Sequence, residues 1–334
     1  MSKIGNIMIS IKEGGLEGFL HLVQDYKYRH SNILVSEWPL SARINSDLMQ
    51  FSRKFGYKLD IYNPQTFTEK IHTYKLLYND PIMSQIVDKF DFKSYVKQIL
   101  GSDKYTAPAY GVWDSFQEIK DAWDSLPSEF VFKSTISGDG KNIIFVKNKD
   151  DVDLESIKED LEKCFMPQFT QLNGFARAYY TCKPRVLAEK YIHEFEGNYN
   201  LSDYKFYCFN GSIECVYTTS RVFTDTENPS DSDYPRTFFD KEWNKIDVTL
   251  ENHPTDSNVK KPIHLEEMIQ IAERLSKGFP FVRIDFYDIL DTPLLGEMTF
   301  YPAGGLKPLQ PLEYDRKLGE KFVLPKEKIE KVKI

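Results

Sequence analysis

The chain has 334 residues, which at about 150 residues per domain suggests roughly two structural units and a hydrophobic core that needs no disulfide or metal. Hydrophobic residues make up 41% of the chain and charged residues 28%, so fibrous and disordered classes are excluded. The net charge of −7 argues against broad attraction to nucleic acid or to an anionic membrane. Any anion that the chain binds must therefore be held by local basic groups.

The first third of the chain is predicted to be mainly helical. Residues 1–62 mix short amphipathic stretches with basic and aromatic residues, as is typical of helices packed on a core. Thr66 and Thr68, with Glu69 close behind, predict the N-cap of the next helix. One further helix should follow and end at Gly101. The segment YTAPAYGVW then favours a short strand, and an acidic helix follows it.

The remainder alternates strands and helices, which indicates an α+β fold with mostly antiparallel sheets towards the C-terminal half. EFVFKST and NIIFVKN predict a hairpin with a flexible loop. A helix over 151–173 leads to the segment RVLAEKYI, which predicts a strand ending at Glu189. Asn210-Gly211 suits a tight turn between two further strands, and 224–262 is interpreted as a long surface excursion. A helix capped by Gly278 and a pair of strands follow.

Four cysteines, Cys164, Cys182, Cys208 and Cys215, occur at spacings that match neither a zinc site nor a redox pair. The first residues lack the basic region and apolar stretch of a secretory signal, and no uncharged run approaches the roughly 20 residues of a membrane-spanning helix. We therefore expect buried thiols in a cytoplasmic protein without a membrane span.

A first candidate site combines Lys133 with the loop SGDGK, in which Ser137, Gly138 and Gly140 lie. A lysine beside a flexible glycine loop can hold a phosphate while the loop amides close over its oxygens. The spacing fits neither a P-loop nor the dinucleotide fingerprint. A plain hairpin turn with solvated charges is the alternative interpretation.

A second candidate lies on the last pair of strands. Because side chains alternate along a strand, Arg283 and Asp285 share one face, as do Glu297 and Thr299. Two carboxylates beside a phosphate-binding cation offer the oxygen ligands that Mg²⁺ prefers. The apolar neighbours would bury these charges, which is costly without a ligand or metal. A cross-strand salt bridge is the alternative.

A third candidate is the strand end from Glu189 to Ile192, with Asp203 and Lys205 downstream. A strand that leads into an exposed backbone segment can bind an adenine edge through main-chain groups, with an apolar residue against the ring. An ordinary strand terminus explains the same residues.

In this order the three candidates resemble the ATP-grasp superfamily, and most closely its TupA-like branch, which is associated with teichuronopeptide and capsular polysaccharide biosynthesis. The resemblance covers roughly residues 55–306. The matching pieces are NPQTFTEKI, VDKFDFKSYVKQILG, GVWDSFQEI, LPSEFVFKSTISGDGKNIIFV, KPRVLAEKYI, DYKFYCFNG, FPFVRIDFYDI and GEMTFYPAGG.

The resemblance implies an ATP-grasp fold, in which two α+β lobes close on ATP behind a helical N-terminal segment. The expected division is a helical segment over 1–62, an α/β subdomain over 63–126, a lobe with a glycine-rich flap over 127–185, and a C-terminal lobe with the metal site over 186–334.

The resemblance also implies roles for individual residues. Lys89 and Lys133 would bind the α- and β-phosphates, and Ser137, Gly138 and Gly140 would belong to the flap. Adenine would be bound by Glu189, Lys190, Tyr191 and Ile192, and the ribose by Asp203 or Glu196. Lys205 and Arg283 would lie by the γ-phosphate, and Asp285, Glu297 and Thr299 would hold Mg²⁺. Thr299 stands where the superfamily pattern has Asn, so its neutral oxygen would bind the metal weakly or through water.

The implied reaction is ATP-dependent ligation of a carboxylate and an amine through an acyl phosphate, acting on a uronic acid or amino-acid carboxylate of a surface-polysaccharide precursor. Arg221 and Arg236 are candidates for binding the substrate carboxylate, with solvated loop arginines as the alternative. His72 and His193 are candidate bases for the amine, with structural roles as the alternative.

Two other functions stay open on the sequence alone. A glycosyltransferase of the same pathway would use Asp285 to hold a metal for a nucleotide sugar. A degenerate ATP-grasp protein would bind polysaccharide or a partner without catalysis, and Thr299 favours this interpretation. The sequence also leaves the oligomeric state open.

Overall fold

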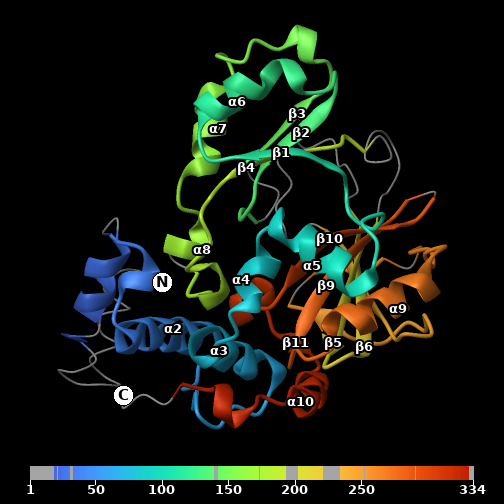
Figure 1. Ribbon diagram of the computed structural model, residues 1–334. Coiled ribbons are helices and arrows are strands. Elements are labelled where there is room, and N and C mark those ends of the chain that lie inside the picture. Colours follow the sequence, from blue (N-terminus) through green and yellow to red (C-terminus); the bar gives the residue numbers. More distant parts are fainter. Residues whose placement is uncertain are drawn as a thin grey trace.

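The computed structural model describes residues 19–20, 22–30, 33–138, 142–172, 174–192, 202–220, 234–251, 253–256, 258–289 and 291–330. Figure 1 shows a small four-stranded sheet at the top, a five-stranded sheet at the lower right and the N-terminal helices at the lower left. Helices and antiparallel sheets are mixed throughout, so the α+β fold class predicted from the sequence is confirmed.

The N-terminal helices pack beside the first helix of the next segment. Residues 22–29 are helical, α2 spans Leu40–Phe55 and α3 spans Phe67–Leu77. The Oγ1 atom of Thr66 accepts a hydrogen bond from the Glu69 amide at 3.1 Å, and the Glu69 carboxylate accepts one from the Thr66 amide at 3.2 Å. This is a capping box, so the N-cap predicted here is confirmed at Thr66.

The single helix expected to end at Gly101 is two helices, α4 (Ile82–Val87) and α5 (Asp91–Leu100), so that expectation was wrong in its interior. The break falls at Asp88, whose Oδ1 accepts hydrogen bonds from the amides of residues 90 and 91 at 2.9 and 3.1 Å. Arg185 forms an ion pair with the same oxygen at 2.9 Å. The Asp88 side chain therefore starts a new helix, which ends at Gly101 as predicted.

The small sheet is antiparallel, with strand order β1-β4-β2-β3. Helices α6 and α7 pack on one of its faces and α8 follows them, so the single helix expected over 151–173 is divided. The elements are β1 (Ala109–Trp113), α6 (Phe116–Ala122), β2 (Phe130–Ser134), β3 (Ile143–Val146), α7 (Lys158–Phe165), α8 (Phe169–Leu172) and β4 (Val186–Glu189). The sheet joins strands from three of the predicted segments, and the proposed division of the chain stays a prediction.

The larger sheet is also antiparallel, with strand order β10-β9-β5-β6-β7, and α9 packs against it. The elements are β5 (Ser202–Phe209), β6 (Ser212–Ser220), β7 (Arg236–Phe239), α9 (Leu265–Ser276), β9 (Val282–Asp288) and β10 (Pro293–Thr299). The interpretation of 224–262 as a surface excursion was wrong for β7, all four residues of which are buried. The hairpin turn at Asn210-Gly211 is confirmed, with positive φ at both residues.

Shorter elements connect and close the fold. A two-stranded sheet pairs β8 (Thr249–Leu250) with β11 (Leu309–Gln310), and α10 (Leu312–Lys321) follows. The 3₁₀ helices are η1 (Val35–Glu37), η2 (Trp123–Ser125), η3 (Lys149–Asp151), η4 (Arg177–Tyr179), η7 (Pro302–Gly305) and η8 (Lys326–Lys328).

Alternation along the strands divides the residues of the five-stranded sheet between two faces. Phe206 on β5 and Ile284 on β9 are paired in register on one face and belong to the large hydrophobic core that includes α9. The neighbouring pair, Lys205 and Asp285, lies on the opposite face, which we call the polar face. This face also carries the buried rings of Tyr207 and Tyr217, so the charged candidates of the sequence border the same core.

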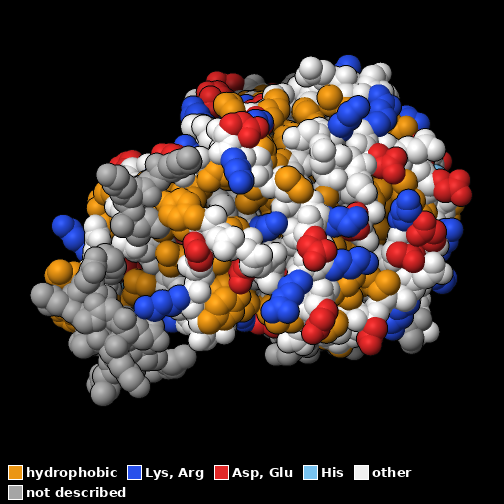
Figure 2. Space-filling model, turned by 90° about the horizontal axis from the view of Figure 1, so that it is seen from below, with side chains coloured by type: hydrophobic (Ala, Val, Ile, Leu, Met, Phe, Trp, Pro, Cys, Tyr) orange, Lys and Arg blue, Asp and Glu red, His pale blue; other side chains and the backbone are white. Residues whose placement is uncertain are grey.

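The surface agrees with the composition. On the face shown in Figure 2, basic and acidic side chains are interspersed, and no continuous basic surface is seen there. Within the described residues no helix is both long and apolar enough to cross a membrane. The four cysteines are free thiols, and three of them are buried as expected, whereas Cys182 is partly accessible.

Removal of the capping box should destabilise the protein measurably. We expect Thr66→Ala to lower the free energy of unfolding by about 1 kcal/mol, because the Glu69 amide loses its acceptor. Urea unfolding followed by circular dichroism measures this. Thr66→Ser keeps the hydroxyl and should stay close to the original protein, and equal losses in both variants would contradict the capping role.

Candidate active site

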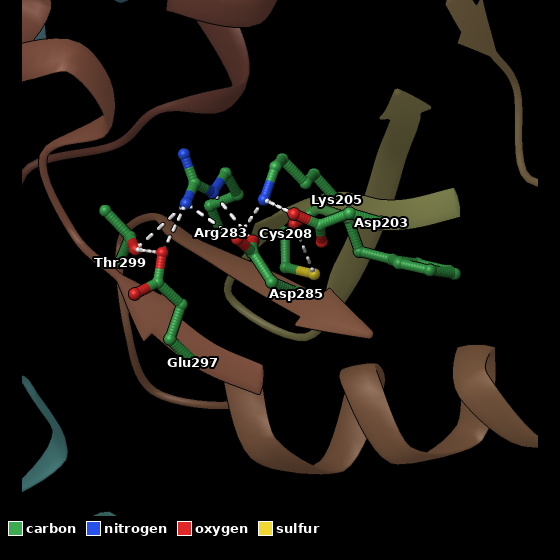
Figure 3. A network of polar contacts seen from close by, with 8 residues as sticks. Asp203, Lys205, Cys208, Arg283, Asp285, Glu297 and Thr299 are labelled. Carbon is green, nitrogen blue, oxygen red and sulfur yellow. Dashed lines mark hydrogen bonds and ion pairs between the residues drawn. The ribbon is translucent and has the colours of Figure 1, made fainter. Parts of the chain in front are cut away.

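Two strands of the five-stranded sheet bring an arginine and a lysine to one aspartate. Asp285 accepts two hydrogen bonds from Arg283, from Nε and from Nη2, both at 2.7 Å. The Nζ atom of Lys205, on the neighbouring strand β5, contacts the Oδ2 atoms of Asp285 and Asp203 at 2.5 Å each. Figure 3 shows Arg283 and Lys205 converging on Asp285 from the two strands. The pair expected on one strand face is thus part of a larger network.

Glu297 and Thr299 on β10 extend this network on its outer side (Figure 3). Glu297 Oε1 accepts a hydrogen bond from Arg283 Nη2 at 2.7 Å. The Thr299 hydroxyl accepts from the same Nη2 at 3.2 Å and donates to Glu297 at 3.2 Å. The strand register places Glu297 opposite Asp285 and Thr299 opposite Arg283. The structure therefore brings together the residues predicted for the metal and the γ-phosphate.

The protonation of these acids follows from burial and pairing. Burial raises the pKa of Asp285 to about 6, against the lowering effect of Arg283 and Lys205. Burial also acts to raise the pKa of Glu297, but Arg283, Lys89 and Lys205 outweigh it and lower that pKa to about 2. At neutral pH both carboxylates are therefore ionised and available as oxygen ligands.

A second charge cluster lies at the end of β4. Glu189 is buried, and its two carboxylate oxygens contact the ammonium groups of Lys133 on β2 and Lys93 on α5, the latter at 2.5 Å. Burial acts to raise the pKa of Glu189, but the two lysines hold it below its ordinary value. The predicted adenine ligand Glu189 is here the counter-ion of the predicted phosphate ligand Lys133.

Lys89 connects the two clusters. Its amide donates to the Thr135 carbonyl at 2.8 Å and its Nζ donates to the Ser137 carbonyl, which ties it to the end of β2. Burial lowers the pKa of Lys89, and the negative charges of Glu297 and Glu189 oppose this shift. Lys89 is thereby held beside the end of β2, and Glu297 of the large sheet and Glu189 of the small sheet both act on its pKa.

The predicted flap and adenine segments lie beside Lys133. Ser137 is buried, Gly138 is exposed, and Tyr191 and Ile192 are buried. The amide of Lys190 donates to the Pro108 carbonyl at 2.8 Å, so that donor is already engaged. Phe145 on β3 is 56% exposed and its ring meets Tyr191 edge-to-face at 6.0 Å between centroids. The strand end thus has an apolar surface beside the lysines.

Other predicted residues are elsewhere or undescribed. Arg236 begins β7 on the polar face of the large sheet, two strands from Lys205. His72 is fully buried, which favours the structural alternative over a base for the amine. The positions of Gly140, Glu196, Arg221 and His193 lie outside the described residues.

The family of the chain follows from comparison of its sequence with known families. The model of the TupA-like ATPgrasp family matches residues 69–323, which is most of the chain. This chain belongs to the TupA-like ATP-grasp family. The resemblance stated from the sequence is confirmed, and the ATP-grasp fold comes with it. No curated protein sequence matches the chain.

Among solved structures, the chain is similar to several ATP-grasp proteins at low identity. The ATP-grasp ligase PsnB in complex with minimal precursor is 10% identical, over 67% of this chain and 55% of that chain, with a TM-score of 0.35. D-cycloserine synthetase DcsG is 13% identical, over 73% and 72%, with a TM-score of 0.40. D-alanine–D-alanine ligase from Bacillus anthracis is 17% identical, over 67% and 59%, with a TM-score of 0.34. The chain spans little more than half the length of the first of these proteins.

Lys93 is a site residue that sequence reasoning missed in this TupA-like ATP-grasp chain. It contacts Glu189 and donates to the Ala107 carbonyl at 2.6 Å, and only 15% of its side chain is exposed. The available signal was its spacing of four residues from Lys89 in the segment KFDFK. That signal was weak, because exposed helices commonly carry lysines at the same spacing.

The Asp285–Glu297–Thr299 set fits a divalent cation of the Mg²⁺ type. The described residues contain no group of three or more His, Cys, Asp or Glu side chains that could hold a metal by themselves. Two ionised carboxylates and a hydroxyl are nevertheless sufficient for Mg²⁺, which keeps water molecules and takes phosphate oxygens as further ligands. Glu297 is 39% exposed at its side chain, so a ligand can reach it.

Loss of the Glu189 charge should destabilise the protein at neutral pH. We expect Glu189→Gln to cost about 3 kcal/mol at pH 7, because Lys93 and Lys133 lose their shared counter-ion. Since the folded pKa of Glu189 is depressed, its contribution is complete above the unfolded value of 4.5 and is lost as the pH falls further. The difference between the two proteins should therefore narrow below about pH 4.5.

Chemical denaturation at a series of pH values measures this difference. Glu155→Gln is the matched control, because Glu155 pairs with Lys120 at 2.6 Å on the exposed surface, where the loss should be below about 1 kcal/mol. A Glu189→Gln protein as stable as this control at pH 7 would contradict the assigned burial of the pair.

Proposed function

We propose that the protein is an ATP-dependent carboxylate–amine ligase of the ATP-grasp type. The carrying observation is geometric: Arg283 and Lys205 contact Asp285 on the large sheet, with Glu297 beside them. On the small sheet, Lys133 contacts Glu189, and Lys89 donates to the Ser137 carbonyl in the loop that follows Lys133. Cations from two sheets thus face a pair of acids suited to Mg²⁺. This is the charge arrangement that phosphoryl transfer from ATP requires, because its transition state spreads negative charge over the transferred group.

We assign the roles of the chain's residues from the family resemblance; Gly140 and Glu196 lie outside the described residues. Lys89 and Lys133 bind the α- and β-phosphates, and Ser137, Gly138 and Gly140 cover the triphosphate. The segment from Glu189 to Ile192 lies along the adenine, with Phe145 beside the ring. Asp203 binds the ribose, with Glu196 as the alternative; Asp203 Oδ2 contacts Lys205, whereas its Oδ1 is buried and has no hydrogen-bond partner among the described residues.

Asp285, Glu297 and Thr299 would hold Mg²⁺, which supplies charge neutralisation for the triphosphate when bound. Arg283 is oriented by its bidentate pair with Asp285, and Lys205 by Asp203 and Asp285. Both cations are therefore fixed before the substrate arrives, so little reorganisation is needed as charge develops on the γ-phosphoryl group.

The reaction has two steps. A substrate carboxylate oxygen attacks the γ-phosphorus, the bond to the β-phosphate oxygen breaks, and an acyl phosphate and ADP form. An amine then attacks the acyl carbon, phosphate leaves with the bonding electron pair, and the amine loses a proton as the amide forms. Positioning and charge stabilisation suffice for both steps, without a covalent protein nucleophile.

Arg236 is our candidate for binding the substrate carboxylate, with Arg221 as a second candidate. Arg236 lies in register with Thr219 and, across β6, with Asp203, and its guanidinium carbon is 5.9 Å from the centre of the Tyr217 ring. Tyr217 is paired in register with Lys205. An acid held by Arg236 would therefore lie on the same sheet face as the γ-phosphate ligands.

We propose that the reaction serves the biosynthesis of a surface polysaccharide, in line with the resemblance stated from the sequence. We infer that the acid is a uronic acid or an amino-acid carboxylate of a capsular or related polysaccharide precursor. The reaction would take place in the cytoplasm, where ATP is supplied.

Nucleotide choice and turnover test the ligase proposal. Mg-ATP should raise the melting temperature and UDP-glucuronic acid should not, because the site is built for a triphosphate. ADP release is then screened with pairs of sugar acids, amino acids and small amines. Lys133→Ala and Glu297→Ala should each lower acid-dependent ADP release about 100-fold or more. Lys120→Ala, at an exposed ion pair with Glu155, is the control that keeps activity.

If UDP-glucuronic acid raised the melting temperature and Mg-ATP did not, the ligase proposal would fail and a glycosyltransferase would be the better interpretation. Binding of Mg-ATP without ADP release for any acid would favour a non-catalytic ATP-grasp protein.

A separate experiment tests whether Arg236 binds the substrate carboxylate. Arg236→Gln should raise the KM for the active acid about 10-fold or more and leave Mg-ATP affinity unchanged, because a charge-assisted bond to one substrate is lost. Arg274→Gln, on α9 at the opposite face of the sheet, is the control. A loss of ATP affinity in Arg236→Gln, or an unchanged KM, would refute the assignment.

A further inference from the structure

The turn that follows β10, the strand that carries Glu297 and Thr299, has an unusual backbone. η7 (Pro302–Gly305) begins three residues after Thr299, and its last three residues have φ values of +50°, +61° and +78°. Glycine adopts this left-handed region at little cost, whereas Ala303 does so at a cost of about 1–2 kcal/mol. Such a turn persists when its surroundings fix it.

A buried charge cluster from the N-terminal helices meets this turn. Asp47 on α2 forms ion pairs at 2.6 Å with His72 Nδ1 and with Lys75 Nζ, both on α3. On their other side, His72 Nε2 lies 3.0 Å from the Gly305 carbonyl and Lys75 Nζ donates to the Gly304 carbonyl at 2.7 Å. The three side chains are at most 2% exposed. Two consecutive carbonyls of the turn are therefore contacted by two side chains of α3 that share Asp47 on α2 as their other partner.

His72 lies between two oxygen atoms. Its Nδ1 is 2.6 Å from Asp47 Oδ2 and its Nε2 is 3.0 Å from the Gly305 carbonyl. A Cβ atom at Gly305 would lie 2.8 Å from the His72 ring, which shows how closely the turn approaches α3. Burial acts to raise the pKa of Asp47, but His72 and Lys75 hold it below its ordinary value.

Helix α3 also contacts the two residues between β10 and the turn, Phe300 and Tyr301. The ring of Tyr74, between His72 and Lys75 on α3, lies 5.5 Å from the ring of Tyr301 and 6.4 Å from that of Phe300. The segment from Phe300 to Gly305 is thus attached to α3 by ring contacts and by two carbonyl hydrogen bonds. The end of β10, with Thr299, is fixed at the point where this segment begins.

We propose that Asp47, His72 and Lys75 are positioning residues for the metal site: by holding the Gly304 and Gly305 carbonyls they fix the end of β10, and with it Glu297 and Thr299. This inference rests on the proposed ATP site. It gives the N-terminal helix α2, which precedes the residues matched by the family, a role in nucleotide and metal binding. Outer groups that orient metal ligands typically change metal affinity about 10–100-fold when they are lost.

Two substitutions of one residue separate this role from general packing. In His72→Gln the side-chain amide replaces Nε2 and can still donate to Gly305, whereas in His72→Asn it replaces Nδ1 and faces Asp47 alone. We expect His72→Asn to weaken Mg²⁺ affinity in the presence of ADP about 10-fold, measured by calorimetry. His72→Gln should stay within about 3-fold of the original protein, even if both variants lose similar thermal stability.

Hydrogen exchange of the peptide covering residues 300–306 gives a second readout that needs no ligand. His72→Asn should raise exchange there, and His72→Gln should not. Asp315→Asn is the control for loss of a buried carboxylate near α3, because Asp315 binds the Thr68 amide and hydroxyl at 3.1 and 3.0 Å and does not contact the turn. It should lower stability without changing Mg²⁺ affinity.

The outcomes separate this inference from the proposed function. Faster exchange in His72→Asn with unchanged Mg²⁺ affinity would reduce the cluster to a structural role and overturn the proposal. An equal loss of Mg²⁺ affinity in His72→Asn, His72→Gln and Asp315→Asn would overturn the proposal as well, since the loss of stability alone would then explain the effect. If the original protein bound neither ADP nor Mg²⁺, the proposed function itself would fail.

Discussion

Charge compensation on the polar face of the five-stranded sheet is the constraint on which the rest of the site depends. Asp203, Asp285 and Glu297 form ion pairs with Lys205 and Arg283, and each of these charges would be costly to bury without its partner. The network is oriented by strand register, since its members are opposite one another on β5, β9 and β10. Rigid strands thereby supply a fixed arrangement of charges, which in the proposed function a triphosphate with its metal would join without reorganisation of the protein.

The second charge cluster, around Glu189, shows which groups pair with the lysines near the small sheet. The buried Glu189 contacts the partly exposed Lys133 and Lys93, and Lys89 donates to the Ser137 carbonyl. In the proposed function, a phosphate would share these lysines with Glu189, because a full displacement would leave the buried carboxylate without a counter-ion. The N-terminal helices add a third buried cluster at Asp47, whose partners His72 and Lys75 contact the turn that follows β10.

Much of the fold was predictable because its local signals are strong. The capping box at Thr66, the turn at Asn210-Gly211 and the hairpin around the SGDGK loop depend on residues close together in the chain. The strand β7 was missed because its four residues are surrounded by Asp, Ser and Pro, and only pairing with β6 makes them a buried strand. The break between α4 and α5 was missed because Arg185, nearly a hundred residues later, helps to hold the Asp88 cap.

The sequence by itself determined the net charge, the local basic groups, the alternation that places Arg283 with Asp285 and Glu297 with Thr299, and the family. Only the tertiary structure decided which charges neutralise one another. Glu189 pairs with Lys133 and Lys93, Lys205 pairs with Asp203 and Asp285, and Asp47 pairs with the side chains that hold a turn more than 250 residues away. The physical reason is that hydrogen-bond and helix periodicity act over a few residues, whereas the cost of burying a charge depends on everything folded around it.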